Sequence, residues 1–222
     1  MLKGKRGIYA AGLENPLMLL CDIGNTTYHF FSNGKSYRED VASFNPSTIR
    51  DKVFYICVNR HVKEALNGLE NWIDLSLHVD FEKYYKTMGI DRIMACEAID
   101  NGVVVDAGSA ITVDVVKGGK FEGGFIYPGA RAMSECYKNI SSALEYSFNF
   151  EVYLDKMPKN SRDAISYGYL KLLQSEVNSY KMDIFLTGGD AVNFKKIFPA
   201  SLVDETLLFR GMKNIMKRAD LC

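Results

Sequence analysis

The feature of this sequence that most constrains its fold is an internal repeat. The stretches "LLCDIGNTTYHFFSNGK" (19–35) and "VVVDAGSAITVDVVKGG" (103–119) align without a gap. Each begins with three apolar residues, continues through Asp-x-Gly and small polar residues into a β-prone run, and reaches a glycine turn at the same distance. Asn33-Gly34 is a strong hairpin signal. Each copy therefore predicts strand, tight turn, strand, turn, strand, and duplication explains motif and spacing together.

The remaining segments alternate between strands and helices. A short apolar run at 52–59 predicts a buried strand, and 183–198 predicts a strand, a glycine pair and a helix. Helices are predicted at 61–72, at 91–99, after Pro128-Gly129, and from Asn160 or Ser161 to about Tyr180. Strand meanders mixed with helices, occurring twice, predict an α/β protein with two similar halves. A cleft between halves is a preferred ligand site.

Composition limits the classes of partner. Lys+Arg and Asp+Glu both number 27, so the chain lacks the basic excess of a nucleic-acid binder. We find no apolar stretch long enough to span a bilayer, and the basic first residues lack the apolar segment of a secretory signal. Five scattered cysteines without a CxxC pair fit a reducing cytosol better than a disulfide framework or a zinc site. We therefore expect neither a nucleic-acid nor a membrane partner.

The first Asp-x-Gly turn has the composition of an anion site. Gly24 lets backbone N–H groups turn toward a ligand without a Cβ in the way. Asn25 and Thr26 add side-chain donors, and Asp22 suits a hydrated Mg²⁺ on a phosphate. A hairpin with a hydrogen-bonded aspartate is the structural alternative.

The second turn, "DAGSAITVD" (106–114), is richer in polar groups. It combines Gly108 with the hydroxyls of Ser109 and Thr112, and it has an acid at each end, Asp106 and Asp114. Thr112 and Asp114 are two residues apart on a strand, so they share a face. A half-buried strand with a polar face would explain this copy alone, but two such turns could hold the phosphates of one nucleotide.

Two further segments allow both a structural and a functional interpretation. In "MGIDRIMACEAI" (88–99), Asp91 is a candidate helix N-cap. It is also a candidate general base, with Arg92 as a clamp for an anionic substrate group. In "LTGGDA" (186–191) the glycine pair forms a tight loop or admits a base or ribose close to the backbone.

Five motifs in order resemble those of type III pantothenate kinases: "DIGNT" (22–26), "GIDR" (89–92), "DAGSAITVD" (106–114), "GGFIYPG" (123–129) and "TGGDA" (187–191). The resemblance implies an acetate and sugar kinase/Hsp70/actin superfamily fold: two ribonuclease H-like domains, 18–101 and 102–222, with an ATP cleft between them. Residues 1–17 lie outside it, as an N-terminal extension. It further implies ATP-dependent phosphorylation of pantothenate, the first step of coenzyme A synthesis. The enzyme would be a cytoplasmic homodimer that needs K⁺ or NH₄⁺ besides Mg²⁺.

The resemblance also implies roles for individual residues. Asp91 matches the proton acceptor, and Asp106 matches the ligand of the monovalent cation. The ATP-binding positions match Asp22, Ile23, Gly24, Asn25, Thr26, Thr27, Tyr28, His29 and Ser109. The substrate-binding positions match Tyr85 (with Tyr84 as the other choice), Gly89, Ile90, Asp91, Arg92 and, supplied by the partner subunit, Ser161. Ser109 and Ser161 stand where the family commonly has threonine, and both keep the hydroxyl. The region around Tyr85 lacks the usual Asn-Pro.

Two functions of other classes remain open at the level of sequence. One is a metal-dependent nuclease of the ribonuclease H type, with Asp22, Asp106 and Asp114 as metal ligands. The other is a non-catalytic ATP-binding regulatory protein of the actin-like superfamily, in which the Gly-Ile-Asp-Arg segment would have no role.

Overall fold

The structure is a computed structural model that describes residues 18–221. The described chain divides after Asp74 into two compact units, here called unit 1 (18–74) and unit 2 (75–221). By its contacts, the segment 75–101 belongs to unit 2. The predicted N-terminal extension, 1–17, lies outside the described residues.

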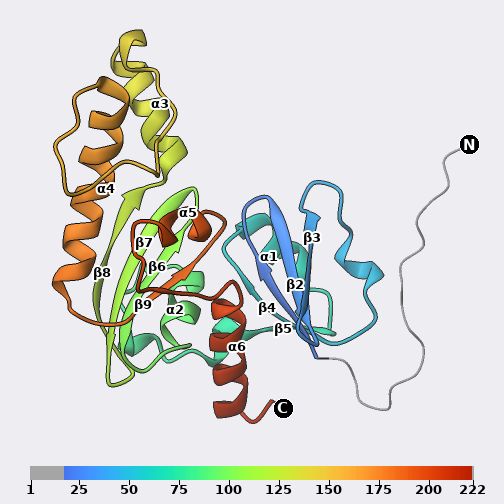
Figure 1. Cartoon of the computed structure of the whole chain (residues 1–222). Helices are drawn as coiled ribbons and strands as arrows, with labels where there is room; N and C mark the ends of the chain where they lie inside the picture. Colours follow the sequence, from blue (N-terminus) through green and yellow to red (C-terminus); the bar gives the residue numbers. More distant parts are fainter. Residues whose placement is uncertain (1–17, 222) are drawn as a thin grey trace, which may run out of the picture. The chain divides into compact units, whose positions relative to one another are not determined.

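Unit 1 is built on a five-stranded sheet of order β3-β2-β1-β4-β5 (Figure 1). The strands are β1 (Leu19–Ile23), β2 (Thr27–Ser32), β3 (Lys35–Asp40), β4 (Val53–Cys57) and β5 (Trp72–Asp74). The first three form an antiparallel meander, whereas β4 pairs in parallel with β1 and β5 in parallel with β4. Asn33 and Gly34 both have positive φ, 49° and 75°, as a tight hairpin turn of this kind requires.

One face of this sheet is covered by α1 (Arg60–Leu66), whose Val62 and Leu66 pack against Cys21 and Ile23. Because side chains alternate along a strand, Asp22 lies on the opposite face. The short 3₁₀ helix η1 (Pro46–Thr48) completes the unit.

The helix predicted over 61–72 is wrong in its second half. The helix α1 ends at Leu66, and the chain passes through Asn67 and Gly68 into β5. Glycine favours helix least among residues other than proline, which accounts for the early end. Trp72 is buried in the core of unit 1 as a strand residue and not as part of a helical face.

Unit 2 contains a sheet with the same connectivity, of order β10-β9-β6-β7-β8. Its strands are β6 (Gly102–Ala107), β7 (Ala110–Lys117), β8 (Lys120–Pro128), β9 (Ile184–Thr187) and β10 (Leu202–Val203). As in unit 1, three antiparallel strands are followed by two that pair in parallel.

The two faces of the second sheet carry different helices (Figure 1). On one face the valines of β6 and β7 pack against α4 (Ser161–Ser179) and α5 (Ala191–Lys195). On the other, α2 (Ile90–Cys96) packs against β7 and against α6 (Leu207–Arg218). The remaining helical segments of unit 2 are α3 (Ala130–Ile140), η2 (Leu75–His78), η3 (Phe81–Lys83) and η4 (Ser142–Leu144).

The same strand order and the same strand directions occur in both units, which is the ribonuclease H-like pattern repeated. This confirms the predicted α/β fold of two similar domains and explains the sequence repeat, since 19–35 and 103–119 are the opening meanders of the two sheets. Within residues 18–221, none of the helices combines the length and the apolar character that crossing a membrane demands.

Candidate active site

The first Asp-x-Gly turn joins β1 to β2 in unit 1. The Gly24 N–H donates to the Thr27 carbonyl at 2.9 Å, and Asn25 and Thr26 are exposed at the tip. Asn59 holds the tip from outside: its Nδ2 donates to the Asn25 carbonyl at 3.1 Å. The same side chain caps α1 by accepting from the N–H groups of His61 and Val62. The turn is thus fixed while its polar groups face solvent.

The second turn joins β6 to β7 in unit 2 and is held more closely. The Gly108 N–H donates to the Ala110 carbonyl at 3.0 Å, and the Gly129 N–H donates to the Ser109 carbonyl at 3.1 Å. A Cβ on Gly129 would lie 2.4 Å from the carbonyl oxygens of both Gly108 and Ser109. Only glycine therefore fits where α3 begins behind this turn.

Gly188 brings a third segment against the same place. It has φ +88°, and a Cβ there would lie 2.3 Å from Asp106 Oδ1 and 2.5 Å from the Ala107 carbonyl. The Asp190 N–H donates to that carbonyl at 2.9 Å. The predicted "TGGDA" loop is therefore in contact with the end of β6, where it encloses Asp106.

Asp106 is a strongly perturbed acid. Burial raises its pKa to about 6, and the negative charges of Asp91 and Asp114 add to the rise. Across the β6–β7 ladder Asp106 pairs with Thr112, whose buried Oγ1 has no hydrogen-bond partner among the described residues. The two side chains lie on one face of the sheet, so they present oxygen atoms to the same space.

The prediction that Asp91 is the N-cap of its helix is wrong. The N-cap of α2 is Gly89, and Asp91 lies in the first turn, where its Oδ1 accepts from the Arg92 N–H at 2.9 Å. A Cβ on Gly89 would lie 2.4 Å from that oxygen, so the glycine makes room for the carboxylate. In the described part of the chain, Oδ2 of Asp91 accepts no hydrogen bond.

Arg92 is buried, with 5% of its surface exposed, and it forms an ion pair with the fully buried Asp114. The guanidinium presents two donors to this carboxylate, with Nε at 3.1 Å from Oδ2 and Nη2 at 2.5 Å from Oδ1. Its third nitrogen, Nη1, donates to the hydroxyl of Tyr85. The predicted anion clamp therefore has most of its donors engaged within the chain.

The structure separates the two candidate tyrosines. Tyr84 donates to Oε1 of Glu97 at 2.9 Å, and burial with the adjacent Glu97 charge raises its pKa well above the usual range. Tyr85 is 42% exposed and contacts Arg92. Both rings pack against Phe121. Of the two hydroxyls, only that of Tyr85 contacts Arg92.

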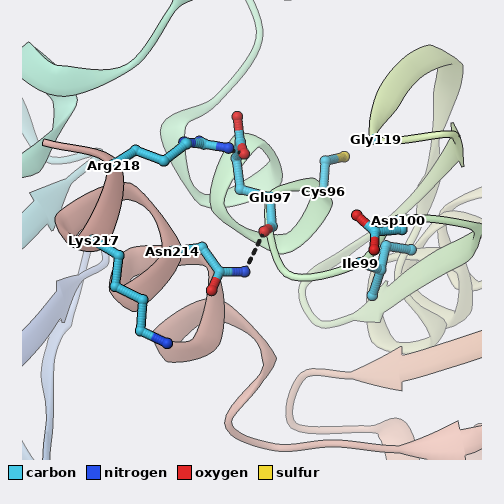
Figure 2. Close-up of a pocket in the computed structure, with 8 residues that line it drawn as sticks. All are labelled: Cys96, Glu97, Ile99, Asp100, Gly119, Asn214, Lys217 and Arg218. Atoms are coloured by element: carbon cyan, nitrogen blue, oxygen red, sulfur yellow. Dashed lines mark hydrogen bonds and ion pairs between the residues drawn. The ribbon is translucent and has the colours of Figure 1, made fainter.

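The helix α2, which carries Asp91 and Arg92, is fixed at its C-terminal end by α6 (Figure 2). Three α6 side chains spaced four residues apart, and so on one face, donate to the segment after α2. Arg210 reaches the Ala98 carbonyl at 3.1 Å, Asn214 the Glu97 carbonyl at 2.9 Å, and Arg218 the Glu97 carboxylate at 2.5 Å.

A pocket of about 290 Å³ lies beside these contacts, lined by Cys96, Glu97, Ile99, Asp100, Gly119, Asn214, Lys217 and Arg218 (Figure 2). None of the residues predicted for the site lines it.

Unit 2 thus brings together Tyr85, Asp91, Arg92 and Asp106 around Asp114, whereas the first phosphate turn belongs to unit 1.

Ser161 is an exposed residue at the first position of α4, after the N-cap Asn160. No group of three or more His, Cys, Asp or Glu side chains between residues 18 and 221 is arranged to hold a metal ion.

Sequence reasoning missed three supporting residues: Asn59, Glu97 and Gly124, the last of which lies against the Arg92–Asp114 ion pair. An asparagine directly before a helical pattern is a cap signal, so Asn59 could have been found. The other two act through contacts distant in sequence.

Comparison with known proteins places these features in one family. The sequence model of the type III pantothenate kinase family matches residues 56–181. A type III pantothenate kinase of Sulfurimonas denitrificans is 74% identical over 205 residues, which are 92% of this chain and 100% of that protein. One from Campylobacter jejuni is 41% identical over 204 residues, covering 90% of this chain and 97% of that protein.

Solved structures of other proteins show the same fold. A Baf family protein of Campylobacter jejuni superimposes with a TM-score of 0.82 at 39% identity, covering 92% of this chain and 100% of that one. A 2-dehydro-3-deoxygalactonokinase-type protein of Sinorhizobium meliloti has a TM-score of 0.51 at 9% identity, covering 91% and 99%, which shows the shared fold alone. The ordered motifs, the duplicated sheet and the near full-length identity together establish that the chain belongs to the type III pantothenate kinase family.

Proposed function

We propose that the chain transfers the γ-phosphoryl group of ATP to the primary hydroxyl of pantothenate, with Asp91 as the proton acceptor. Phosphorylation of pantothenate at the start of coenzyme A biosynthesis is the activity of its family. The observation that carries the residue assignment is the geometry of Asp91. One carboxylate oxygen is held by the Arg92 N–H at 2.9 Å, and the other makes no hydrogen bond within residues 18–221.

This arrangement suits a general base. The hydrogen bond to Oδ1 orients the carboxylate, so Oδ2 is presented to a ligand in one direction. A positioned base of this kind contributes roughly 10²–10⁴-fold to a rate. Asp91 would take the proton from the pantothenate hydroxyl as its oxygen attacks the γ-phosphorus.

Phosphoryl transfer depends on positioning and on neutralising charge more than on covalent chemistry. A kinase of this class uses ATP with a divalent metal. In unit 1, residues 22–29 would bind phosphate oxygens through the exposed tip of the turn, with Mg²⁺ near Asp22. In unit 2, Ser109 would contact ATP from the corresponding turn. The sequence-based prediction of an ATP cleft, and of a domain boundary between residues 101 and 102, stays a prediction.

A monovalent cation, K⁺ or NH₄⁺, fits the surroundings of Asp106. The half-buried Asp106 carboxylate and the Thr112 hydroxyl, which lacks a hydrogen-bond partner within the described chain, offer oxygen donors on one face. Oxygen ligands are those that hard cations prefer. Such an ion would offset negative charge close to the transferring phosphoryl group.

The substrate would be held by Tyr85 and by the backbone of Gly89 and Ile90, with Arg92 bonded to the Tyr85 hydroxyl behind them. The partner subunit's Ser161 would complete the site in a homodimer. Unit 2 exposes several large apolar side chains, as expected of a surface that associates; they include Ile140, Tyr146, Tyr153, Met157 and Leu172. The enzyme would act in the cytoplasm.

The nuclease alternative is disfavoured by Asp114. Both of its carboxylate oxygens are engaged by Arg92, so it is not available as the third metal ligand that this alternative needs. A non-catalytic ATP-binding protein would leave the carboxylate of Asp91 without a role.

The experiment is a coupled ADP-release assay on the purified full chain with ATP, Mg²⁺ and pantothenate, in K⁺, NH₄⁺ or Na⁺ buffer. We expect pantothenate-dependent turnover that K⁺ or NH₄⁺ stimulates, with phosphorylated pantothenate identified by mass spectrometry. Asp91→Asn should lower kcat about 100-fold or more while the thermal midpoint stays unchanged, because Asn keeps the Oδ1 acceptor and Gly89 is the cap. Near-normal kcat in a folded Asp91→Asn variant would refute the base assignment.

A further inference from the structure

The ion pair between Arg92 and Asp114 is fully removed from solvent, yet it lies at the start of the helix that carries Asp91. Both side chains are 5% exposed or less. Two parallel N–H···O contacts fix the plane of the guanidinium as well as its position. Arg92 therefore has one orientation, and its Nη1 takes no part in the ion pair.

The sheet is shaped to accept this pair. Gly124 of β8 lies opposite Asp114 of β7 in the ladder. A Cβ on Gly124 would lie 2.3 Å from Asp114 Oδ1 and 3.0 Å from Arg92 Nη2. Any other residue would displace both partners, so the glycine leaves the space that the pair fills.

Nη1 of Arg92 donates to the Tyr85 hydroxyl oxygen, and the guanidinium also lies 5.7 Å from the centre of the Tyr85 ring. Because the hydroxyl oxygen accepts this bond, its own proton must point away from Arg92. Tyr85 is 42% exposed, so that proton is directed at a ligand or at solvent. A donor polarised by a neighbouring cation makes a stronger hydrogen bond than a neutral hydroxyl alone.

We propose that Asp114 is a positioning residue for the substrate site: it fixes Arg92 so that the Tyr85 hydroxyl donates to an acceptor oxygen of the substrate. This rests on the proposed function, in which pantothenate supplies the acceptor through its carboxylate or amide carbonyl. Substrate recognition then depends on a chain of three side chains, Asp114, Arg92 and Tyr85, of which only Tyr85 is exposed.

A purely structural ion pair is the competing explanation, and it makes different predictions. A structural Asp114 would affect stability and both substrates alike. A positioning Asp114 acts through Tyr85. Its substitution therefore raises the KM for pantothenate, and this rise disappears when the Tyr85 hydroxyl is absent.

The test compares Tyr85→Phe, Asp114→Asn and the double variant by steady-state kinetics with each substrate varied. We expect each single variant to raise the KM for pantothenate roughly 10-fold or more, as loss of a hydrogen bond to a charged group does, with the KM for ATP unchanged. Asp114→Asn should add less than about 3-fold in the Tyr85→Phe background, because the two act as one unit. Tyr84→Phe is the matched control and should leave the KM for pantothenate unchanged, since its hydroxyl bonds Glu97.

Multiplicative effects in the double variant, or equal rises in both KM values, would overturn the proposal. So would an unchanged KM for pantothenate in Tyr85→Phe, a variant that removes only the hydroxyl and keeps the ring against Phe121. If Asp114→Asn fails to fold, the comparison of Tyr85→Phe with Tyr84→Phe still decides, because only the Tyr85 hydroxyl accepts from Arg92. A wild-type chain without pantothenate-dependent turnover would instead refute the proposed function, and this inference with it.

Discussion

The crossing of α2 and α6 gives a prediction in which two effects of opposite sign compete. Gly211 in α6 faces α2 so closely that a Cβ there would lie 1.8 Å from the Met94 carbonyl oxygen and 2.7 Å from its carbon. Gly168, in the middle of α4, has nothing within 4 Å of the same position. Glycine-to-alanine substitution at these two sites therefore compares the same chemical change with and without a backbone obstacle.

Helix propensity alone favours alanine by about 1 kcal/mol at either site. At Gly168 this gain stands, so we expect Gly168→Ala to stabilise unit 2 by about 0.5–1 kcal/mol. At Gly211 the obstacle is backbone, which cannot rotate away, and the helices must separate by more than about 1.5 Å to restore an ordinary contact. Overpacking costs about 1–3 kcal/mol and occasionally more, and a contact of 1.8 Å to backbone lies at the upper end of that range. Subtracting the propensity gain of about 1 kcal/mol leaves an expected net loss of about 2 kcal/mol.

Differential scanning calorimetry of the two variants measures the outcome. For a chain of this length 1 kcal/mol corresponds to about 2–4 °C, so Gly168→Ala should raise the thermal midpoint slightly and Gly211→Ala should lower it by about 4–8 °C. Because Met94 follows Arg92 by two residues in α2, Gly211→Ala should also lower kcat for pantothenate phosphorylation. Equal midpoints for the two variants would refute the packing argument.

Three other predictions concern single sites. Burial and the Arg38 charge lower the pKa of His29 to about 4 from its ordinary 6.5. Protonation of His29 therefore favours unfolding. The free energy of unfolding should be highest above pH 6.5 and should fall by about 1–2 kcal/mol toward pH 4, after allowance for solvent screening. Urea denaturation at several pH values should show that His29→Gln removes this part of the loss. Asp106→Asn should abolish the stimulation of turnover by K⁺ and any K⁺-dependent rise in the thermal midpoint, and a retained stimulation would exclude Asp106 as the ligand. Gly188→Ala, which combines φ +88° with a contact of 2.3 Å to Asp106, should destabilise the chain by about 2–4 kcal/mol, measured by urea denaturation against wild type.

Much of the fold could be predicted because its signals are local. Alternating apolar residues and glycine turns predict the two meanders, and Asn33-Gly34 has the positive φ values that its sequence implies. The helix over 61–72 was overextended for the converse reason. Its apolar spacing continues through Leu69, but Gly68 ends the helix and the pairing of Trp72 with Val53 in the sheet decides the rest. Tertiary pairing, which no window of sequence contains, outweighed periodicity there.

The sequence indicates which residues are candidates for the site, but it does not indicate which of them contact one another. The motif "GIDR" marks Asp91 and Arg92, and "TVD" marks Asp114, yet 22 residues separate the partners of the ion pair, and neither motif alone indicates that one engages the other. The same holds for Gly124, because nothing in the motif 123–129 indicates that a Cβ at this position would collide with the buried carboxylate of Asp114.

The two copies of the repeat also diverge in a way that bears on their roles. In unit 1 the turn is tethered from one side by Asn59 and leaves Asn25 and Thr26 exposed. In unit 2 the equivalent turn is packed against Gly129 and Gly188, and it follows a half-buried acid, Asp106, whose pKa is raised to about 6. Exposed polar groups at a tip are accessible to phosphate oxygens, whereas a positive charge beside Asp106 would lower its raised pKa and favour the carboxylate. On the proposed function, the exposed turn of unit 1 binds phosphate oxygens, and a monovalent cation at Asp106 would make the turn of unit 2 electrostatically compatible with the phosphates of ATP.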